Sequence, residues 1–298
     1  MRLSLPPSFP IAKATWPIAV ERPPIESHTG VDYDTSWSRR YPARLTRAVL
    51  VDDVLRPLAH VLAWPRVHGL DRIQTLEAPA IFAANHNSHL DTTLLLASLP
   101  ERFRHRTVVA AAADYFFSNR TVGTLSALAI GAIPMDRTKV GRRSADLAAE
   151  LLGDGWNLVI FPEGGRSPDG WGQTFRGGAA YLALRCGRPV VPVYLEGTRR
   201  IWKRGAKWPT PARRGAGVQL SFGAPLRPTD GEDSRRFSAR IEAAVAALAD
   251  EWTTDWWTAR KRAATGATPA LTGPRSGAWR RAWAVDAGRS ANARRTWP

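Results

Sequence analysis

The segment AANHNSHLDTT, residues 83–93, places two imidazoles and a carboxylate between two apolar runs. His86 and Asp91 are separated by four residues, and Asn87 or Ser88 can cap a helix that follows. A carboxylate bound to one imidazole nitrogen fixes the tautomer and raises the basicity of the other nitrogen. The pattern therefore predicts that His86 acts as a general base on a substrate hydroxyl, with Asp91 as the group that orients it.

The same spacing is compatible with two other interpretations. In the first, His86 and Asp91 only cap a helix and do no chemistry. In the second, His86, His89 and Asp91 are metal ligands, although zinc would usually take further ligands from elsewhere in the chain. The sequence offers no second cluster of His, Asp or Glu for that purpose, and we expect no metal.

Two more polar clusters follow apolar runs. GAIPMDR (131–137) ends in Arg137, and FPEGGRS (161–167) contains Glu163 and Arg166. In a parallel α/β sheet, groups that follow the strands meet at one crevice at the carboxyl edge. A guanidinium binds two phosphate oxygens at once, and glycines let backbone N–H groups approach an anion. The three clusters together predict a site for a phosphate-bearing substrate.

Four blocks occur in order along the chain: HNSHLD (86–91), GAIPMDR, FPEGGRS and VVPVYLEGT (190–198). They resemble the four sequence blocks of the glycerolipid acyltransferase family, typified by 1-acylglycerol-3-phosphate acyltransferase, over roughly residues 65–225. The resemblance implies transfer of a fatty acyl group from an acyl thioester to the free hydroxyl of a lysophospholipid. The thioester is on coenzyme A or acyl carrier protein and serves as co-substrate, and no other cofactor is implied. The implied product from 1-acyl-glycerol-3-phosphate is phosphatidic acid.

The resemblance also implies roles for single residues. It makes His86 the base and Asp91 its partner. It assigns substrate binding to the residues that match the second and third blocks: Gly131, Arg137, Glu163, Gly164 and Arg166. One position departs from the family pattern, because Gly165 stands where the third block usually has threonine. That departure bears on the acceptor more than on the reaction type.

Short apolar runs alternate along the chain as expected strands and helices. Strands are expected at residues 80–84, 107–112, 132–135, 157–161, 190–195 and 218–222. Helices are expected at residues 92–99, 121–130, 144–152, 177–185 and 237–257. This alternation predicts an α/β fold with a mostly parallel central sheet flanked by helices. An apolar stripe over residues 42–64 adds an N-terminal helix, which either packs on the core or lies on anionic lipid.

Composition divides the chain into three regions. Residues 1–41 read as an irregular arm, residues 42–262 as the acyltransferase domain, and residues 263–298 as a basic tail with Trp and Arg that we expect to be disordered. The chain has 298 residues and a net charge of +16, which favours anionic partners. The single cysteine, Cys186, cannot form an internal disulfide and suits a reducing compartment.

Prolines interrupt the N-terminus where a signal peptide needs an apolar core, and no apolar run reaches the roughly 18 residues of a membrane span. We therefore expect a cytoplasmic protein bound peripherally at the inner face of the membrane. The 42–64 helix, the basic charge and clustered tryptophans such as Trp252, Trp256 and Trp257 would hold it to an anionic membrane surface.

Other functions remain open on the sequence alone. A lyso- or polyol-lipid with another headgroup could be the acceptor. A thioester hydrolase would use water in place of the acceptor hydroxyl, which leaves the predicted pair Arg137 and Arg166 without a purpose. A nucleic-acid-binding protein would explain the charge but not the strand-end clusters, and no nucleic-acid motif is present, so we expect no specific nucleic-acid partner.

Overall fold

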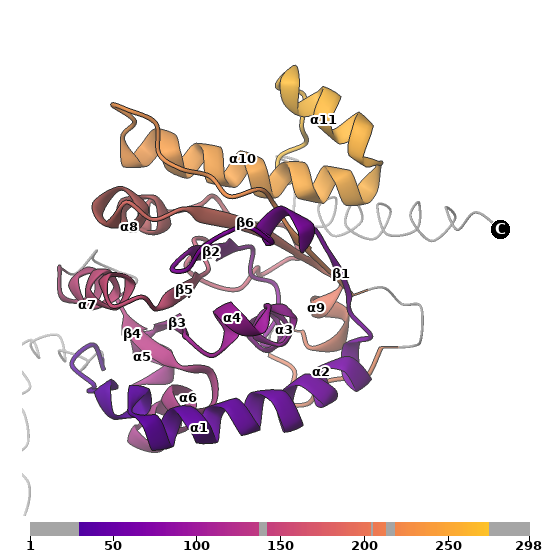
Figure 1. Ribbon diagram of the computed structural model, residues 1–298. Helices are drawn as coiled ribbons and strands as arrows, with labels where there is room; N and C mark the ends of the chain where they lie inside the picture. Colours follow the sequence, from indigo (N-terminus) through magenta and orange to yellow (C-terminus); the bar gives the residue numbers. More distant parts are fainter. Residues whose placement is uncertain (1–29, 137–141, 204, 213–217, 274–298) are drawn as a thin grey trace, which may run out of the picture.

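The computed structural model describes residues 30–136, 142–203, 205–212 and 218–273. Within them a seven-stranded sheet runs in the order β1-β7-β6-β2-β5-β3-β4 (Figure 1). The strands are β1 (Arg66–His68), β2 (Ile81–Ala84), β3 (Thr107–Ala112), β4 (Ala132–Met135), β5 (Asn157–Ile160), β6 (Val190–Glu196) and β7 (Gln219–Phe222). Only β6 and β7 pair antiparallel among these strands. The predicted α/β fold with a mostly parallel sheet is confirmed.

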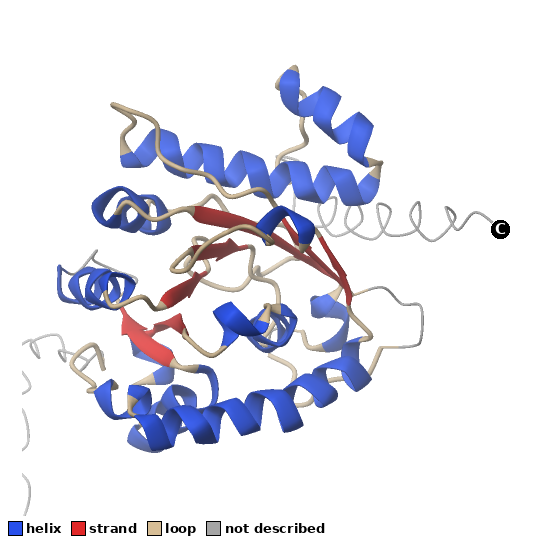
Figure 2. Cartoon of the chain, in the orientation of Figure 1, coloured by secondary structure: helices blue, strands red, loops and turns tan. Residues whose placement is uncertain are grey.

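Helices cover both faces of the sheet (Figure 2). On one face lie α1 (Tyr41–Val49), the π-helical η2 (Leu50–Leu55), α2 (Arg56–Ala63), α3 (Leu90–Ser98), α4 (Glu101–Arg104), α6 (Arg120–Ile130) and α9 (Thr198–Ile201). On the other lie α7 (Arg142–Gly153), α8 (Gly178–Cys186) and α10 (Ser234–Thr253), with α11 (Trp256–Ala264) beyond α10. Three short turns of helix, η1 (Ser36–Arg39), η3 (Asp71–Ile73) and α5 (Ala113–Phe116), complete the elements.

The central strands are apolar on both sides because each contributes to two cores. In β2, Phe82 and Ala84 pack with α2 and α3, whereas Ile81 and Ala83 pack with α7, α8 and α10. Successive side chains of a strand point to opposite faces, so a strand covered on both faces reads as one continuous apolar run. This double burial fixes β2 at the centre of the sheet and with it the loop that carries His86.

The folded unit is wider than the predicted 42–262. Before it, the Tyr33 ring packs on Phe117 with centroids 5.2 Å apart, and the Tyr33 hydroxyl hydrogen-bonds Thr124 at 2.7 Å. After it, the backbone N–H of Gly172 donates to Leu271 at 2.9 Å, and Leu271 packs against the core. Single anchors of this kind leave no periodic pattern in a polar segment. The rest of the expected arm and tail, residues 1–29 and 274–298, lies outside the described residues.

Two further elements differ from expectation. The single helix predicted over 237–257 is two helices, because the side chain of Asp255 accepts the N–H of Thr258 at 2.9 Å and starts α11. The strand β1 was not predicted. Its three residues pair in parallel with β7 at the edge of the sheet and are too few to show alternation.

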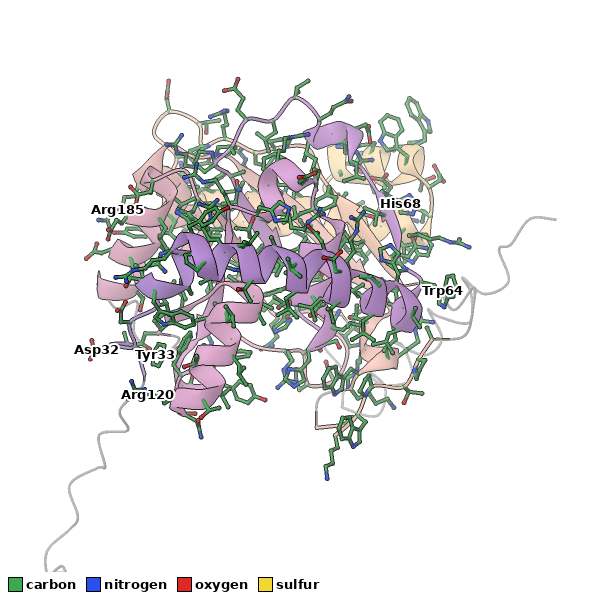
Figure 3. The ribbon with its side chains drawn as sticks, turned by 60° about the horizontal axis from the view of Figure 1, so that its bottom comes forward. Asp32, Tyr33, Trp64, His68, Arg120 and Arg185 are labelled. Carbon is green, nitrogen blue, oxygen red and sulfur yellow. The ribbon has the colours of Figure 1, made fainter. Side chains whose placement is uncertain are left out.

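The predicted N-terminal helix is present as α1, η2 and α2. Val51, Ala59 and Ala63 face the core. The outer side exposes large apolar residues: Tyr41, Leu45, Val49, Val54, Leu58, Val61 and Trp64. Figure 3 shows this helix lying across one face of the molecule with α6 beside it, and α6 exposes Val122 and Leu125. No helix in the described part of the chain has the length and apolar run that spanning a bilayer requires.

Candidate active site

His86 and Asp91 form a hydrogen-bonded pair at the carboxyl end of β2. His86 lies in the loop after the strand, and Asp91 lies in the first turn of α3. Nδ1 of His86 is 2.9 Å from Oδ2 of Asp91. The Asp91 side chain is fully buried, whereas the His86 side chain is 18% exposed. The imidazole is therefore held from the protein side and open on the other.

The Asp91 carboxylate also holds the loop. Its Oδ2 accepts the backbone N–H groups of Asn87 at 2.6 Å and Ser88 at 2.7 Å. A carboxylate at this point also complements the positive end of the α3 dipole. Because the carboxylate can only accept, Nδ1 of His86 donates, and Nε2 carries the lone pair that can take a proton.

The third cluster clamps the backbone of His86. The backbone N–H of His86 donates to Oε1 of Glu163 at 2.8 Å, and the backbone carbonyl of His86 accepts the N–H of Ser167 at 2.9 Å. The Phe161 ring stacks on the imidazole with centroids 4.1 Å apart. The Asn85 side chain bonds both backbone groups of Leu195 in β6, at 2.7 and 2.9 Å. The first and third clusters thus meet at one edge, as the sequence predicted.

Glu163, predicted to bind substrate, holds the backbone of the site in this structure. Glu163 is only 2% exposed, and its Oε2 accepts the N–H of Gln173 at 2.9 Å while Oε1 holds His86. Both oxygens therefore face protein backbone. Burial raises the pKa of Glu163 to about 7, against the effect of these two N–H groups, which favour the ionised form. Through Oε1, Glu163 positions the backbone of His86.

Arg166 lies at the open side of the site, in a group of ring-bearing side chains. Its guanidinium is 5.8 Å from the centroid of Tyr115. The His89 ring lies 6.2 Å from the Tyr115 ring and 5.2 Å from the Trp202 ring. Burial, followed by the nearby positive charge of Arg166, lowers the pKa of His89 to about 4, so His89 is neutral at physiological pH. Sequence reasoning missed Tyr115 and Trp202, because both belong to four-residue helices or their ends.

The two glycines predicted to bind substrate both have positive φ angles. Gly131 ends α6 with φ +66° and precedes β4, so it lies at the amino edge of the sheet, away from His86. A Cβ there would meet Arg47 and, at 3.0 Å, the carbonyl oxygen of Thr107. Gly164 has φ +74°, and a Cβ there would lie 2.9 Å from the Arg176 guanidinium. Gly164 thus allows the turn that brings Glu163 under His86.

Two further positions from the sequence analysis are Arg137 and Gly165. Arg137 lies outside the described residues. Gly165, which replaces the usual threonine, accepts the Gln173 side-chain amide on its carbonyl at 3.1 Å. As for the metal alternative, His, Cys, Asp and Glu residues in the described ranges form no group of three that could hold an ion.

Nearby protein hydroxyls are engaged elsewhere. Ser88 Oγ donates to the carbonyl of Trp202 at 2.9 Å, and Ser167 Oγ accepts the N–H of Gly170 at 2.7 Å. The chemistry that this geometry offers is therefore proton removal from a group that a substrate brings. Fold and site together define an α/β protein with a histidine–carboxylate pair at the carboxyl edge of its sheet.

The comparisons with known proteins agree with this class. The family model Acyltransferase matches residues 65–196. A chloroplastic 1-acyl-sn-glycerol-3-phosphate acyltransferase of Brassica napus, BAT2, is 31% identical over 145 residues, which is 47% of this chain and 40% of that protein. The human 1-acyl-sn-glycerol-3-phosphate acyltransferase beta is 32% identical over 118 residues, 39% of this chain and 40% of that protein.

A solved structure shares the fold. The crystal structure of the 1-acyl-sn-glycerophosphate acyltransferase PlsC from Thermotoga maritima superposes with a TM-score of 0.53 at 22% identity, covering 75% of this chain and 85% of that one. Over residues 65–196, this chain is therefore similar to acyltransferases, which agrees with the resemblance of its four sequence blocks to the glycerolipid acyltransferase family. The matched part spans about two fifths of the length of the two curated relatives named above.

Proposed function

We propose that the protein is an O-acyltransferase that moves a fatty acyl group from an acyl thioester to the free hydroxyl of a lysophospholipid. The acceptor that the relatives favour is 1-acyl-glycerol-3-phosphate, which gives phosphatidic acid. The observation that carries the proposal is the contact between His86 and Asp91, 2.9 Å long, with the imidazole open on its other side. The acyl thioester is a co-substrate, and the proposed reaction needs no further cofactor.

In the proposed reaction the acceptor oxygen attacks the thioester carbonyl while Nε2 of His86 takes its proton. Asp91 stabilises the imidazolium that forms. Collapse of the tetrahedral intermediate breaks the C–S bond, and the departing thiolate receives the proton from His86. General-base catalysis of this kind accelerates a reaction by about 10²–10⁴-fold.

The oxyanion of that intermediate needs hydrogen-bond donors. The backbone N–H groups closest to the imidazole are already used: that of His86 by Glu163, and those of Asn87 and Ser88 by Asp91. In the adjacent loop, the N–H of Gly165 has no acceptor among the described residues. We assign this N–H to the oxyanion.

Arg166 is the described residue that suits the acceptor phosphate. It borders the open side of His86 together with His89 and Tyr115. A planar guanidinium can bind two phosphate oxygens and so fix the direction of the attached hydroxyl. Arg137 remains a predicted second partner, carried over from the family resemblance.

We further propose that the apolar face rests on a membrane. This face consists of the exposed residues of α1, η2 and α2 (Tyr41, Leu45, Val49, Val54, Leu58, Val61 and Trp64) with Val122 and Leu125 of α6. Arg40, Arg56 and Arg120 flank it and are exposed. Apolar side chains bordered by arginines suit a bilayer that carries anionic headgroups, where each basic residue contributes about 1 kcal/mol. The cytoplasmic leaflet carries such anionic lipids, and we assign the contact to it.

The tryptophans of α11 cannot join in this contact. Trp256 and Trp257 are exposed, but α11 lies beyond α10, on the side of the sheet opposite α1 and α2 (Figure 1). One flat bilayer does not reach both sides. Within the described ranges, we therefore assign the peripheral attachment to the apolar face.

The reaction is tested with purified full-length protein, acyl-CoA and a panel of lysophospholipids, with the products identified by mass spectrometry. We expect a diacyl product, and most from the phosphate-only headgroup. His86→Ala should lose turnover by at least about 10²-fold, while His68→Ala, at an exposed histidine of β1, should keep it. Free fatty acid as the main product would indicate a thioester hydrolase, and acyl transfer by His86→Ala would contradict the role of this residue.

The membrane contact is tested by co-sedimentation with vesicles that contain phosphatidylglycerol. Leu45→Glu with Leu58→Glu should abolish binding, because both side chains are about half exposed on the apolar face. The matched control is Trp256→Glu with Trp257→Glu on α11. Equal binding by the Leu45/Leu58 variant and the wild type would disprove the assignment of this face, and so would loss of binding in the control.

A further inference from the structure

We propose that the loop after α9 binds the phosphates and the adenine of a coenzyme A donor. The donor loop, as we name it, comprises Arg200 at the end of α9 and Lys203, Lys207 and Trp208 after it. This inference rests on the proposed function, because it specifies the carrier of the acyl group. Neither the catalytic pair nor the acceptor site uses these residues.

The charge in this part of the chain is concentrated. Residues 197–229 contain eight of the 42 Lys and Arg residues and none of the 26 Asp and Glu residues. The net charge of this segment is half of the +16 of the whole chain. In the described part of the chain, Arg200, Lys203 and Lys207 are exposed and form no ion pair. The donor loop therefore presents positive charge that the protein itself does not neutralise.

The donor loop is fixed to the catalytic site at its first turn. The carbonyl of Trp202 accepts Ser88 Oγ at 2.9 Å, and the Trp202 ring is 5.2 Å from that of His89. Arg199 donates to the carbonyls of Ser167 and Pro168, both at 3.0 Å, and so joins the loop to the third cluster. Arg200 and Lys203 thus flank Trp202, which contacts the loop that carries His86.

Hydrogen bonds also shape the rest of the donor loop. Trp202 Nε1 donates to the carbonyl of Ala206 at 3.0 Å, and the N–H of Ala206 donates to Lys203 at 3.1 Å. At its end, the N–H of Ala212 donates to Leu62 of α2 at 2.8 Å. Trp208 lies between these anchors and is 76% exposed. An indole held in this way can stack on a nucleotide base, and three nearby cations can bind its phosphates.

The reach of the donor matches this arrangement. The pantetheine arm between thiol and pyrophosphate is roughly 15 Å when extended, from ordinary bond lengths. Lys207 is five residues beyond Trp202, so the chain places it at most about 18 Å from that anchor. A thioester at His86 and phosphates at the donor loop are therefore compatible with one bound coenzyme A molecule.

Direct binding tests the inference without depending on turnover. Titration calorimetry of the full-length protein compares coenzyme A, its 3′-dephospho form, and pantetheine, which has neither phosphate nor adenine. We expect the wild type to bind coenzyme A about tenfold or more tightly than pantetheine, a difference that shrinks at high salt. The triple variant Arg200→Glu, Lys203→Glu and Lys207→Glu should bind both with the same weak affinity.

A matched control carries the same charge change elsewhere: Arg235→Glu, Arg260→Glu and Lys261→Glu on α10 and α11. We expect its affinity for coenzyme A to stay within twofold of the wild type, apart from the general effect of net charge, which the salt series removes. Trp208→Ala should weaken binding of coenzyme A but not of inorganic pyrophosphate. Equal loss in the control and the triple variant would overturn the proposal.

A last comparison distinguishes coenzyme A from phospholipid headgroups as the ligand of the donor loop. If the donor loop bound phospholipid headgroups instead, the triple variant would lose affinity for phosphatidylglycerol vesicles and keep its affinity for coenzyme A, which would refute our assignment. The protein could also bind coenzyme A through the donor loop and yet transfer no acyl group. That result would support the assignment of the donor loop and contradict the proposed function. The two ideas therefore fail in different measurements.

Discussion

Replacing Asp91 by Asn removes one charge from the centre of the site and changes almost no volume. In the native protein, Oδ2 of Asp91 accepts three N–H groups: Nδ1 of His86 and the backbone groups of Asn87 and Ser88. A carboxamide keeps one accepting oxygen and turns the other into a donor. If the oxygen takes the place of Oδ2, it can still accept all three N–H groups, but it carries no charge, and the NH2 takes the buried place of Oδ1, which has no hydrogen-bond partner among the described residues. The imidazolium that forms when Nε2 takes the proton then lacks the negative charge that stabilises it.

The expected loss of activity exceeds the expected loss of stability. A comparable carboxylate-to-amide exchange beside a catalytic histidine costs about 10⁴-fold in turnover. Hydrogen bonds to a charged group contribute about 1.5–3 kcal/mol each and neutral ones about 0.5–1.5 kcal/mol. Weakening the backbone bonds of Asn87 and Ser88 therefore costs about 2 kcal/mol of unfolding free energy, after allowance for the easier burial of a neutral amide.

The assay measures kcat at saturating acyl-CoA and lysophospholipid, together with urea unfolding of the same samples. Asp250→Asn is the matched control, because Asp250 is also buried and accepts a charged donor, Arg262, at 2.8 Å on the distant helix α10. Both variants should lose stability, but only Asp91→Asn should lose turnover. The reasoning would be refuted if Asp91→Asn, while folded, turned over as fast as Asp250→Asn.

Two further predictions concern the loop beneath His86. Burial holds the Glu163 pKa at about 7 in the folded state, against an ordinary value of 4.5. Between pH 4.5 and 7 the folded protein therefore binds a proton on Glu163 that the unfolded protein has lost. The free energy of unfolding should therefore fall by about 3 kcal/mol as pH rises from 4.5 to 7. Glu163→Gln should flatten that slope in urea titrations, and an unchanged slope would show that another group causes it. Gly164→Ala should cost about 1–2 kcal/mol, because its φ is +74°, and should raise the acceptor KM. Gly187→Ala, at φ +62° in open space after α8, should cost the same stability and leave KM alone.

The sequence predicted the parts of the site that depend on where strands end. His86, Asp91 and Arg166 come together because β2 and β5 are adjacent parallel strands, and apolar runs reveal such strands. The direction in which Glu163 points could not be predicted in this way. A motif gives the position of a carboxylate along the chain, whereas the backbone turn at Gly164 decides whether it faces a ligand or the backbone of His86.

Other parts of the fold leave too little periodicity in the sequence for their structure to be predicted. Tyr115 and Trp202 border the site from short elements, α5 and the end of α9, where four residues show no helical period. The break before α11 depends on one capping side chain, Asp255, within a pattern that otherwise continues. Gly131 fits the second block of the family, yet its φ of +66° and its place before β4 account for it without a substrate.

The open side of His86 and the apolar face meet at one residue. Tyr115 is half exposed, lies beside Arg166 and His89, and belongs to α5, which packs against α6 of the apolar face. A lysophospholipid in a bilayer beneath α6 would keep its acyl chain among apolar groups while its phosphate moved toward Arg166. Because Asp91, Glu163 and Phe161 hold His86 from the protein side, the base would not have to move to meet it. The arrangement therefore brings a membrane-held hydroxyl to a fixed base, whereas water would reach the same base from the solvent without needing an apolar path.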